Sequence, residues 1–118
     1  MATADLRPLS EAERAIITRL LSLDFPGRDG LAEQLRSASV RPVDEYGSLA
    51  IETSGRPASV HKRIPVEAEG RDEDGVAVYL LLHVVDGLAS ELEIYKADGS
   101  PLLRKVDASS LQVFSLPK

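Results

Sequence analysis

Two histidines, His61 and His83, are the only side chains of this sequence that act as bases near neutral pH, and they are its only imidazole groups for a metal ion. The strand register derived below places them on opposite faces of a sheet, which argues against a shared catalytic or metal site. We interpret His83 as a histidine whose hydrogen bonds are satisfied in the core or at its rim. We interpret His61, which precedes Lys62 and Arg63, as part of a solvated strand end.

Paired carboxylates are the second group that could do chemistry. Glu91 and Glu93 are two residues apart in a β-prone run, so their side chains share one strand face, and Glu67 is expected on the same face two strands away. Such carboxylates can transfer protons or bind a hard cation, but a solvated outer face is the simpler interpretation. The acidic run 72–74 lacks the ordered ligand spacing of an EF-hand loop, so we interpret it as a solvated loop.

Motifs for phosphate binding or nucleophilic catalysis are absent from the sequence: it has no Gly-x-Gly-x-x-Gly, no Walker pattern and no Gly-x-Ser-x-Gly. It also has no cysteine, which excludes disulfides, thiolate metal sites and cysteine nucleophiles. We therefore expect no catalytic residue, no metal and no cofactor, and an enzyme is the less favoured class.

The composition is that of a folded domain, with 118 residues, 43% of them hydrophobic and 28% charged. We expect a frayed segment over residues 1–8 and a single α+β domain over residues 9–118. The net charge of −5 argues against nucleic acid as a partner, because phosphate binding depends on excess Lys and Arg. No apolar run approaches the roughly 18–20 residues of a membrane span. The N-terminus lacks the order of a secretory signal, so we expect a cytoplasmic protein with no membrane partner.

A β-hairpin over residues 76–95 is the strongest structural signal. Two β-prone runs are separated by Asp86-Gly87, the dipeptide typical of a type I′ turn, in which both central residues have positive φ. A two-residue loop at this point predicts that Leu81 lies opposite Leu92, and that the 76–85 run is a central strand because it is apolar on both sides.

This register sorts the side chains into two faces. The predicted core face comprises Tyr79, Leu81, His83, Val85, Leu88, Ser90, Leu92 and Ile94. The other face is predicted to be a partner-binding patch, because an apolar centre with a charged rim is typical of interaction sites. Its members are Leu80, Leu82, Val84 and Tyr95, with Arg63 and His61 on one side and Glu91 and Glu93 on the other. Coverage of this face by the C-terminal strand or a loop is the competing interpretation.

The remaining elements complete the fold class. Ser10 and Glu13 have capping-box spacing, which predicts a helix over residues 11–23, and a second helix is predicted over 30–37 with Asp29 as its cap. Alternating runs then predict strands as far as the C-terminus, among them a short one over 102–106. The expected fold is α+β, with two N-terminal helices packed on one face of an antiparallel, mostly meandering sheet of five to six strands.

Three motifs follow a helix that ends in Leu-Asp-Phe-Pro-Gly (23–27): Ile-Pro-Val-Glu-Ala-Glu-Gly (64–70), Leu-Leu-His-Val-Val-Asp-Gly (81–87) and Ser-Glu-Leu-Glu-Ile-Tyr (90–95). With them the sequence resembles a family of small uncharacterised bacterial proteins, a domain of unknown function frequent in actinobacteria, over residues 9–114. The resemblance implies a stand-alone unit of bacterial origin. It implies no activity, so no site residue is taken from it.

The leading hypothesis for function is a non-enzymatic protein-binding module that neutralises a basic partner, in the manner of a small acidic immunity protein or antitoxin. A second hypothesis is a small-ligand-binding protein or modest hydrolase with a pocket between helices and sheet, in which Tyr79 and His83 supply polar groups. A third is a structural homodimer through the same sheet face.

Overall fold

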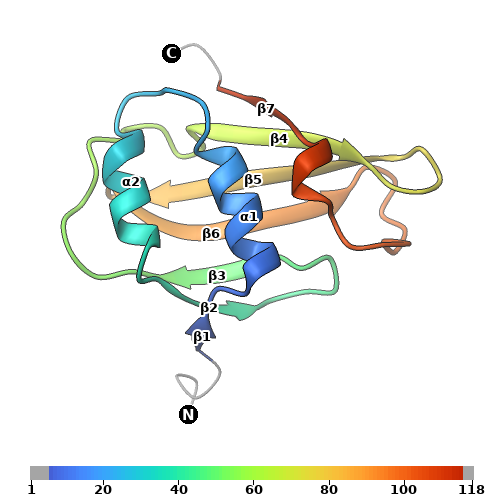
Figure 1. The fold of residues 1–118 in the computed structure, drawn as a ribbon, viewed down its shortest axis with the longest axis horizontal. Coiled ribbons are helices and arrows are strands. Elements are labelled where there is room, and N and C mark those ends of the chain that lie inside the picture. Colours follow the sequence, from blue (N-terminus) through green and yellow to red (C-terminus); the bar gives the residue numbers. More distant parts are fainter. Residues whose placement is uncertain (1–5, 116–118) are drawn as a thin grey trace.

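The computed structural model describes residues 6–115, which form two α-helices on a seven-stranded sheet. Every pair of neighbouring strands is antiparallel, in the order β1-β2-β3-β6-β5-β4-β7 (Figure 1). The predicted α+β class is confirmed, with seven strands rather than five to six. The elements are β1 (Arg7–Pro8), α1 (Glu11–Leu20), α2 (Arg28–Leu35), β2 (Ser39–Pro42), β3 (Leu49–Glu52), β4 (Val66–Arg71), β5 (Ala77–Val85), β6 (Leu88–Lys96), the 3₁₀ helix η2 (Ala108–Ser110) and β7 (Gln112–Phe114).

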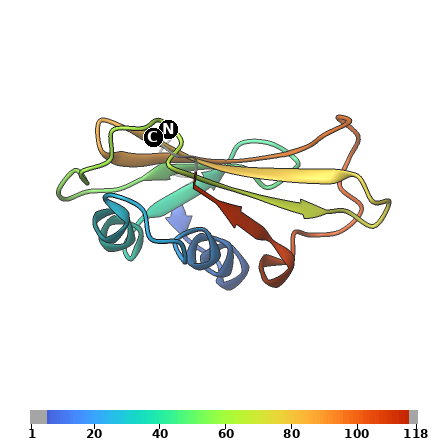
Figure 2. The same ribbon diagram turned by 90° about the horizontal axis from the view of Figure 1, so that it is seen from above.

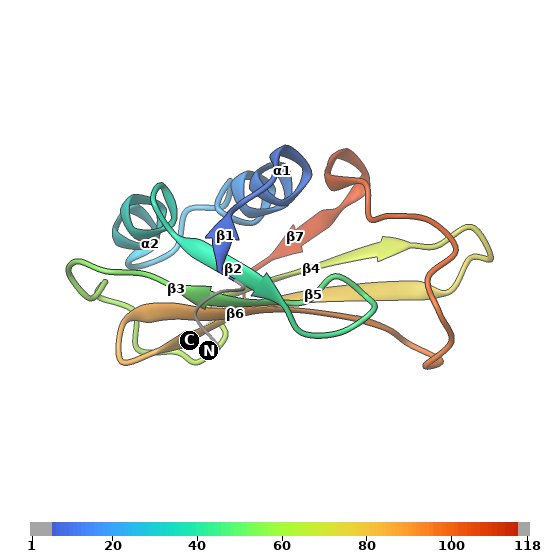
Figure 3. The same ribbon diagram turned by 90° about the horizontal axis from the view of Figure 1, so that it is seen from below.

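Both helices and η2 lie on the same side of the sheet, as the two edge-on views show (Figures 2 and 3). The core fills the layer between the helices and the sheet. Its fully buried side chains include Leu20 and Leu31 from the helices and Leu80 and Leu92 from the sheet. Among the described residues, no helix covers the opposite side of the sheet. The segment that links β3 to β4 passes on that side near the β5–β6 turn, and the sheet otherwise has one inner face and one partly exposed face.

Helix α1 begins with the predicted capping box. The Ser10 side chain accepts a hydrogen bond from the Glu13 amide, and the Glu13 carboxylate accepts one from the Ser10 amide. Arg7 also donates two hydrogen bonds of 2.8 Å to Glu13. These, opposed by partial burial and aided by the Ser10 amide, lower the pKa of Glu13 to about 2. Together the contacts join β1 to the helix start.

Helix α2 begins earlier than predicted, at Arg28, and its N-cap is Gly27 rather than Asp29. Gly27 has a φ of 88°, and a Cβ there would lie 2.4 Å from Cγ2 of Val60. Glycine is required because of both the positive φ and the close approach of the segment that links β3 to β4. Contact with the β3–β4 segment therefore sets the start of α2 at Arg28, and helical periodicity in the sequence does not predict such a contact.

The β5–β6 hairpin has the predicted tight turn. Asp86 and Gly87 have φ values of 53° and 79°, as a type I′ turn requires. The pairing of Val84 with Ala89 and of His83 with Glu91 leaves Ser90 as an extra residue in β6, a β-bulge. Beyond the bulge the register differs by one residue from the prediction.

The bulge reverses the predicted faces of β5. Leu82, rather than Leu81, pairs with Leu92, and Leu81 pairs with Glu93. The inner face of β5 is formed by Val78, Leu80, Leu82 and Val84, all at most 4% exposed. The predicted outward placement of Leu80, Leu82 and Val84 is therefore wrong, as is the inward placement of Tyr79, Leu81 and His83, because a one-residue shift moves every side chain to the other face.

The chain ends differ from the prediction in two places. Of the segment predicted to be frayed, residues 1–5 lie outside the described part, whereas Arg7 and Pro8 form β1 against β2. The predicted strand over 102–106 is an irregular segment that leads to η2. The final strand is β7, which pairs with β4 and forms one edge of the sheet.

Candidate functional site

The candidate site is the solvent-facing side of the central strands, here called the outer face (Figure 3). The strand pairings place Arg71, Ala77 and Gln112 on this face, together with the side chains that make up the candidate site. The side chains of the candidate site are Glu67 and Glu69 from β4, Tyr79, Leu81 and His83 from β5, Glu91, Glu93 and Tyr95 from β6, and Phe114 from β7. Unlike the inner face, this set combines apolar and acidic side chains.

Cross-strand pairing arranges the outer face in columns. Leu81 pairs with Glu67 on one side and with Glu93 on the other. Because neighbouring strands lie about 4.8 Å apart, the β4 and β6 carboxylates form two columns roughly 10 Å apart. The β5 column of Tyr79, Leu81 and His83 runs between them. The face is therefore an apolar strip bordered by acid on both sides.

One end of the strip is aromatic. The rings of Tyr79 and Tyr95 pair across the strands with centroids 5.3 Å apart and planes inclined by 39°. Tyr95 is 40% exposed at this end, whereas Phe114, which is 42% exposed, lies on β7 level with Leu81, on the far side of Glu67. Rings held in such pairs offer contact area at small cost in conformational entropy, as at many protein interfaces.

The other end of the strip is closed by a polar cluster around His83. Its Nε2 lies 2.8 Å from Oε1 of Glu93, and Arg63 donates from Nε to His83 Nδ1 over 3.0 Å. Since Nδ1 accepts a hydrogen bond, the neutral ring carries its proton on Nε2 and donates to Glu93. Both nitrogens are thus engaged. The imidazole orients Arg63 and Glu93 and has no free nitrogen for a substrate.

The structure brings together only part of the predicted partner-binding set. Glu91, Glu93 and Tyr95 lie on the outer face, and Arg63 lies at its end. Leu80, Leu82 and Val84 belong to the core instead, and His61 is exposed in the segment that links β3 to β4. Tyr79 and His83, the predicted pocket residues, lie on the side of the sheet away from the helices.

Leu81 and Phe114 are members of the outer face that the sequence analysis did not place there. Residues 76–85 are apolar at nearly every position, so their pattern did not distinguish the two faces of β5. The acidic residues that pair beside them carried the usable signal. Glu93 is 41% exposed and Leu92 is fully buried, which identifies the outward side of β6.

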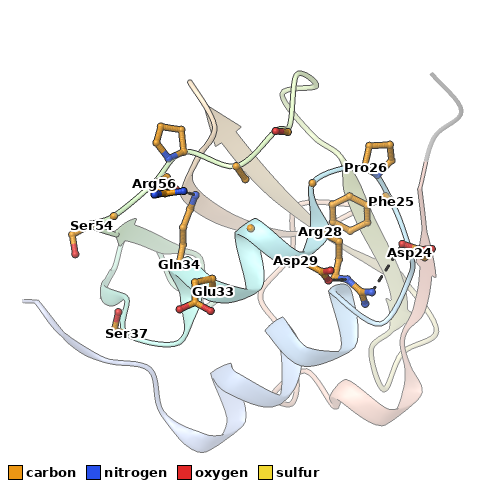
Figure 4. Close-up of a pocket in the computed structure, with 16 residues that line it drawn as sticks. Asp24, Phe25, Pro26, Arg28, Asp29, Glu33, Gln34, Ser37, Ser54 and Arg56 are labelled. Atoms are coloured by element: carbon orange, nitrogen blue, oxygen red, sulfur yellow. Dashed lines mark hydrogen bonds and ion pairs between the residues drawn. The ribbon is translucent and has the colours of Figure 1, made fainter.

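A second candidate is an open groove of about 800 Å³ between the start of α2 and the segment 54–59 (Figure 4). Its charged side chains are of both signs: Arg28 lies 2.8 Å from Asp29 and 4.0 Å from Asp24. At its inner end, Gln34 is 4% exposed and has three hydrogen bonds within the protein. The buried Nε of Arg28 has no hydrogen bond, but it lies within ion-pair distance of the Asp29 carboxylate. The groove therefore offers mixed charge that is largely paired within the protein, which makes it the weaker candidate.

Gln34 instead fastens three segments together. Its Nε2 donates to the carbonyls of Arg56 and Gly87 over 3.0 and 2.8 Å, and its Oε1 accepts from the Ala89 amide over 3.0 Å. Gly87 O also accepts from the Ala58 amide, and a Cβ on Gly87 would lie 2.6 Å from Ala58 O. The β5–β6 turn is thus packed tightly against the β3–β4 segment.

Replacing Gln34 with alanine is expected to lower the free energy of unfolding by about 1–3 kcal/mol, because the buried Ala89 amide loses its acceptor. Urea denaturation measures the change, and Glu33→Ala, at an exposed neighbouring position of α2, is the control. Equal midpoints for the two variants would contradict the role of Gln34.

A third cluster consists of buried charges at the far end of β6. The side chains of Lys96 and Asp72 are 1% and 0% exposed, and their Nζ and Oδ2 atoms lie 2.8 Å apart. Asp74 also accepts from Lys96 Nζ over 2.8 Å, as does the Pro101 carbonyl over 3.1 Å. The predicted solvated loop over 72–74 is therefore partly buried. Two of its three acidic side chains, those of Asp72 and Asp74, accept hydrogen bonds from the ammonium group of Lys96.

The ionisation of this cluster follows from these contacts. Burial acts to raise the pKa of Asp72, but hydrogen bonds from Lys96 and from two backbone amides outweigh it and lower the pKa to about 2. Burial likewise acts to lower the pKa of Lys96, and the two carboxylates outweigh it and raise the pKa to about 12. The charged forms are favoured, so the cluster is a structural ion pair.

The described residues contain no group of three or more His, Cys, Asp or Glu side chains arranged to hold a metal ion. Within the same residues, no helix is long and apolar enough to cross a membrane. The described residues form an α+β protein whose outer face is partly exposed and bordered by acidic side chains. The model of the family described as "Domain of unknown function (DUF6984)" matches residues 6–106, and the chain belongs to this family. Comparisons with curated proteins and with solved structures give no match.

Proposed function

We propose that this protein is a non-enzymatic protein-binding module whose outer face binds a basic partner, as a small acidic immunity protein or antitoxin does. The observation that carries the proposal is the partly exposed strip of Tyr79 and Leu81 between the carboxylate columns of β4 and β6, with Tyr95 beside Tyr79 at its aromatic end. Exposed apolar patches bordered by polar residues are typical of protein interaction sites. The function predicted from the sequence is retained, with a different set of apolar residues.

Charge supports a basic partner. Glu67 and Glu91 are both partly exposed on the outer face, so a partner can reach their carboxylates. Glu69 pairs with Arg71 at 3.6 Å, and the whole chain has a net charge of −5. Complementary charges chiefly raise the association rate and specificity, while burial of the strip supplies affinity.

The same charges disfavour the homodimer. A two-fold dimer through the outer face would place identical patches against each other. The carboxylates of Glu67 and Glu91 would then be buried near other carboxylates, which costs free energy. The hydrolase alternative is disfavoured because both ring nitrogens of His83 are engaged and Tyr79 is paired with Tyr95 on an open face.

The test compares capture of partners by three forms of the protein from a lysate of its source. The forms are the wild type, the double variant Glu67→Lys with Glu91→Lys, and the control Glu11→Lys with Glu33→Lys. The control makes the same charge change on the helices of the opposite side. We expect a basic protein that is retained by the wild type and the control and lost with the outer-face variant. Thermal melting of each form checks folding.

The captured protein is then purified and its affinity for the three forms measured. A partner that binds all three forms equally, or that the helix-side control loses instead, would contradict the proposal. Sedimentation tests the homodimer. If the mass of the wild type rises with concentration while the outer-face variant stays monomeric, the outer face is a self-association surface instead.

A further inference from the structure

The width of the outer face indicates which kind of partner element it fits. The β4 and β6 carboxylate columns are two strand spacings apart, roughly 10 Å. An α-helix with its side chains is about 10–12 Å in diameter. A helix laid along β5 would therefore rest on the apolar strip with one acidic column along each flank.

The lengthwise spacing fits the same element. Tyr79 and Leu81 are two residues apart on β5, about 6.6 Å along the strand. Residues three and four apart on a helix are separated by about 4.5–6 Å along its axis. An apolar stripe of helical period can therefore contact the aromatic pair and Leu81 in succession.

The flanking charges define the rest of the partner element. Glu67 and Glu93 lie on either side of Leu81, and Glu69 and Tyr95 lie on either side of Tyr79. A helix with Lys or Arg on both sides of its apolar stripe can direct cations to both columns while their alkyl stems cover apolar surface. Tyr95 can also receive such a cation on its ring face.

An extended peptide fits less well. Strand addition uses the unpaired backbone groups of a sheet edge, and the outer face presents side chains only. The two edge strands are also short, with two residues in β1, one of them Pro8, and three in β7. Pro8 has no amide hydrogen to donate, which further blunts that edge.

We infer that the outer face binds a basic amphipathic α-helix of a partner protein, lying along β5 between the two acidic columns. This inference rests on the proposed function and specifies the recognised element. The partner's helix has one apolar stripe with Lys or Arg along both of its margins.

Two synthetic peptides of equal composition test the inference. Each has about 18 residues, or five helical turns. One places leucines on a single helical stripe with lysines on both margins, and the other alternates leucine and lysine with the period of a strand. Binding to the intact protein is measured by titration calorimetry at low and at high salt, and circular dichroism records helix formation.

We expect the helical-pattern peptide to bind about tenfold or more tightly than the strand-pattern peptide, with affinity falling as salt rises. The Glu67→Lys and Glu91→Lys double variant should bind it about tenfold more weakly, and the Glu11→Lys and Glu33→Lys control should bind it as the wild type does.

Equal or tighter binding of the strand-pattern peptide would overturn the helix inference while leaving a basic partner on this face. Equal binding of the helical peptide by the wild type and the outer-face variant would also overturn it, as would the absence of binding by both peptides. The capture experiment above decides the proposed function separately, because it depends on the natural partner and not on the shape of a probe.

Discussion

The free energy of unfolding is expected to fall by about 2–5 kcal/mol when Leu82 is replaced by alanine. Leu82 is fully buried on the inner face of β5, where it pairs across the strands with Leu92. Truncation removes its buried methyl groups and leaves a cavity between sheet and helices. Equilibrium urea denaturation measures the loss as a lower midpoint at an unchanged slope.

The matched control is the same substitution at the next residue, Leu81→Ala. Leu81 is half-buried on the outer face, between two carboxylates, so its truncation should cost about 1 kcal/mol or less. The two variants together test the β-bulge at Ser90. A larger loss of unfolding free energy for Leu81→Ala than for Leu82→Ala would indicate the register without a bulge and would contradict the outer face as described.

The second large effect is expected at Lys96. Its replacement by methionine leaves the buried Asp72 carboxylate without its cation, and removing one partner of a buried pair is strongly destabilising. The control is Lys105→Met, which removes the same charge from an exposed position. We expect the midpoint of thermal unfolding at neutral pH to fall markedly in the first variant and to change little in the second.

Acid should change the contribution of Asp72 to stability in opposite directions in the Lys96→Met variant and in the Lys105→Met control. In the folded control, Asp72 has a pKa of about 2, below the ordinary value of 3.8. Its contribution to the free energy of unfolding is therefore complete above pH 3.8 and is lost as the pH falls toward 2. Lys96 has a raised pKa of about 12, so its contribution is complete below 10.5 and is lost as the pH rises through 12. Without Lys96, acid neutralises an unpaired buried carboxylate, so the gap between variant and control should narrow as the pH falls. Parallel stability curves would contradict this account.

Local features of the fold were predictable from the sequence because they depend on few neighbouring residues. The capping box of Ser10 and Glu13 and the turn at Asp86-Gly87 are confirmed, since each is fixed by backbone geometry within four residues. Helix α1 ends three residues earlier than the predicted position 23, at Leu20. Such ends depend on what the chain meets next.

The candidate site was harder to predict because one extra residue controls it. Ser90 carries no signal that distinguishes a bulge from a regular strand position, yet it moves Leu81 outward and Leu82 inward. The acidic residues of β6 were placed correctly, because alternation with Leu92 is clear in the sequence. Burial of Asp72 was missed because its partner, Lys96, is 24 residues away along the chain.

The amide group of Gln34 has a mechanical consequence for the molecule. One side chain of α2 bonds to the β3–β4 segment, to the hairpin turn and to the first residues of β6. The helical layer consequently cannot swing away from the sheet without loosening the very hairpin whose outer side carries Tyr79, Leu81 and Tyr95. Movement of α2 and movement of the β5–β6 hairpin are therefore coupled through Gln34, and the helix layer stabilises the position of the outer face.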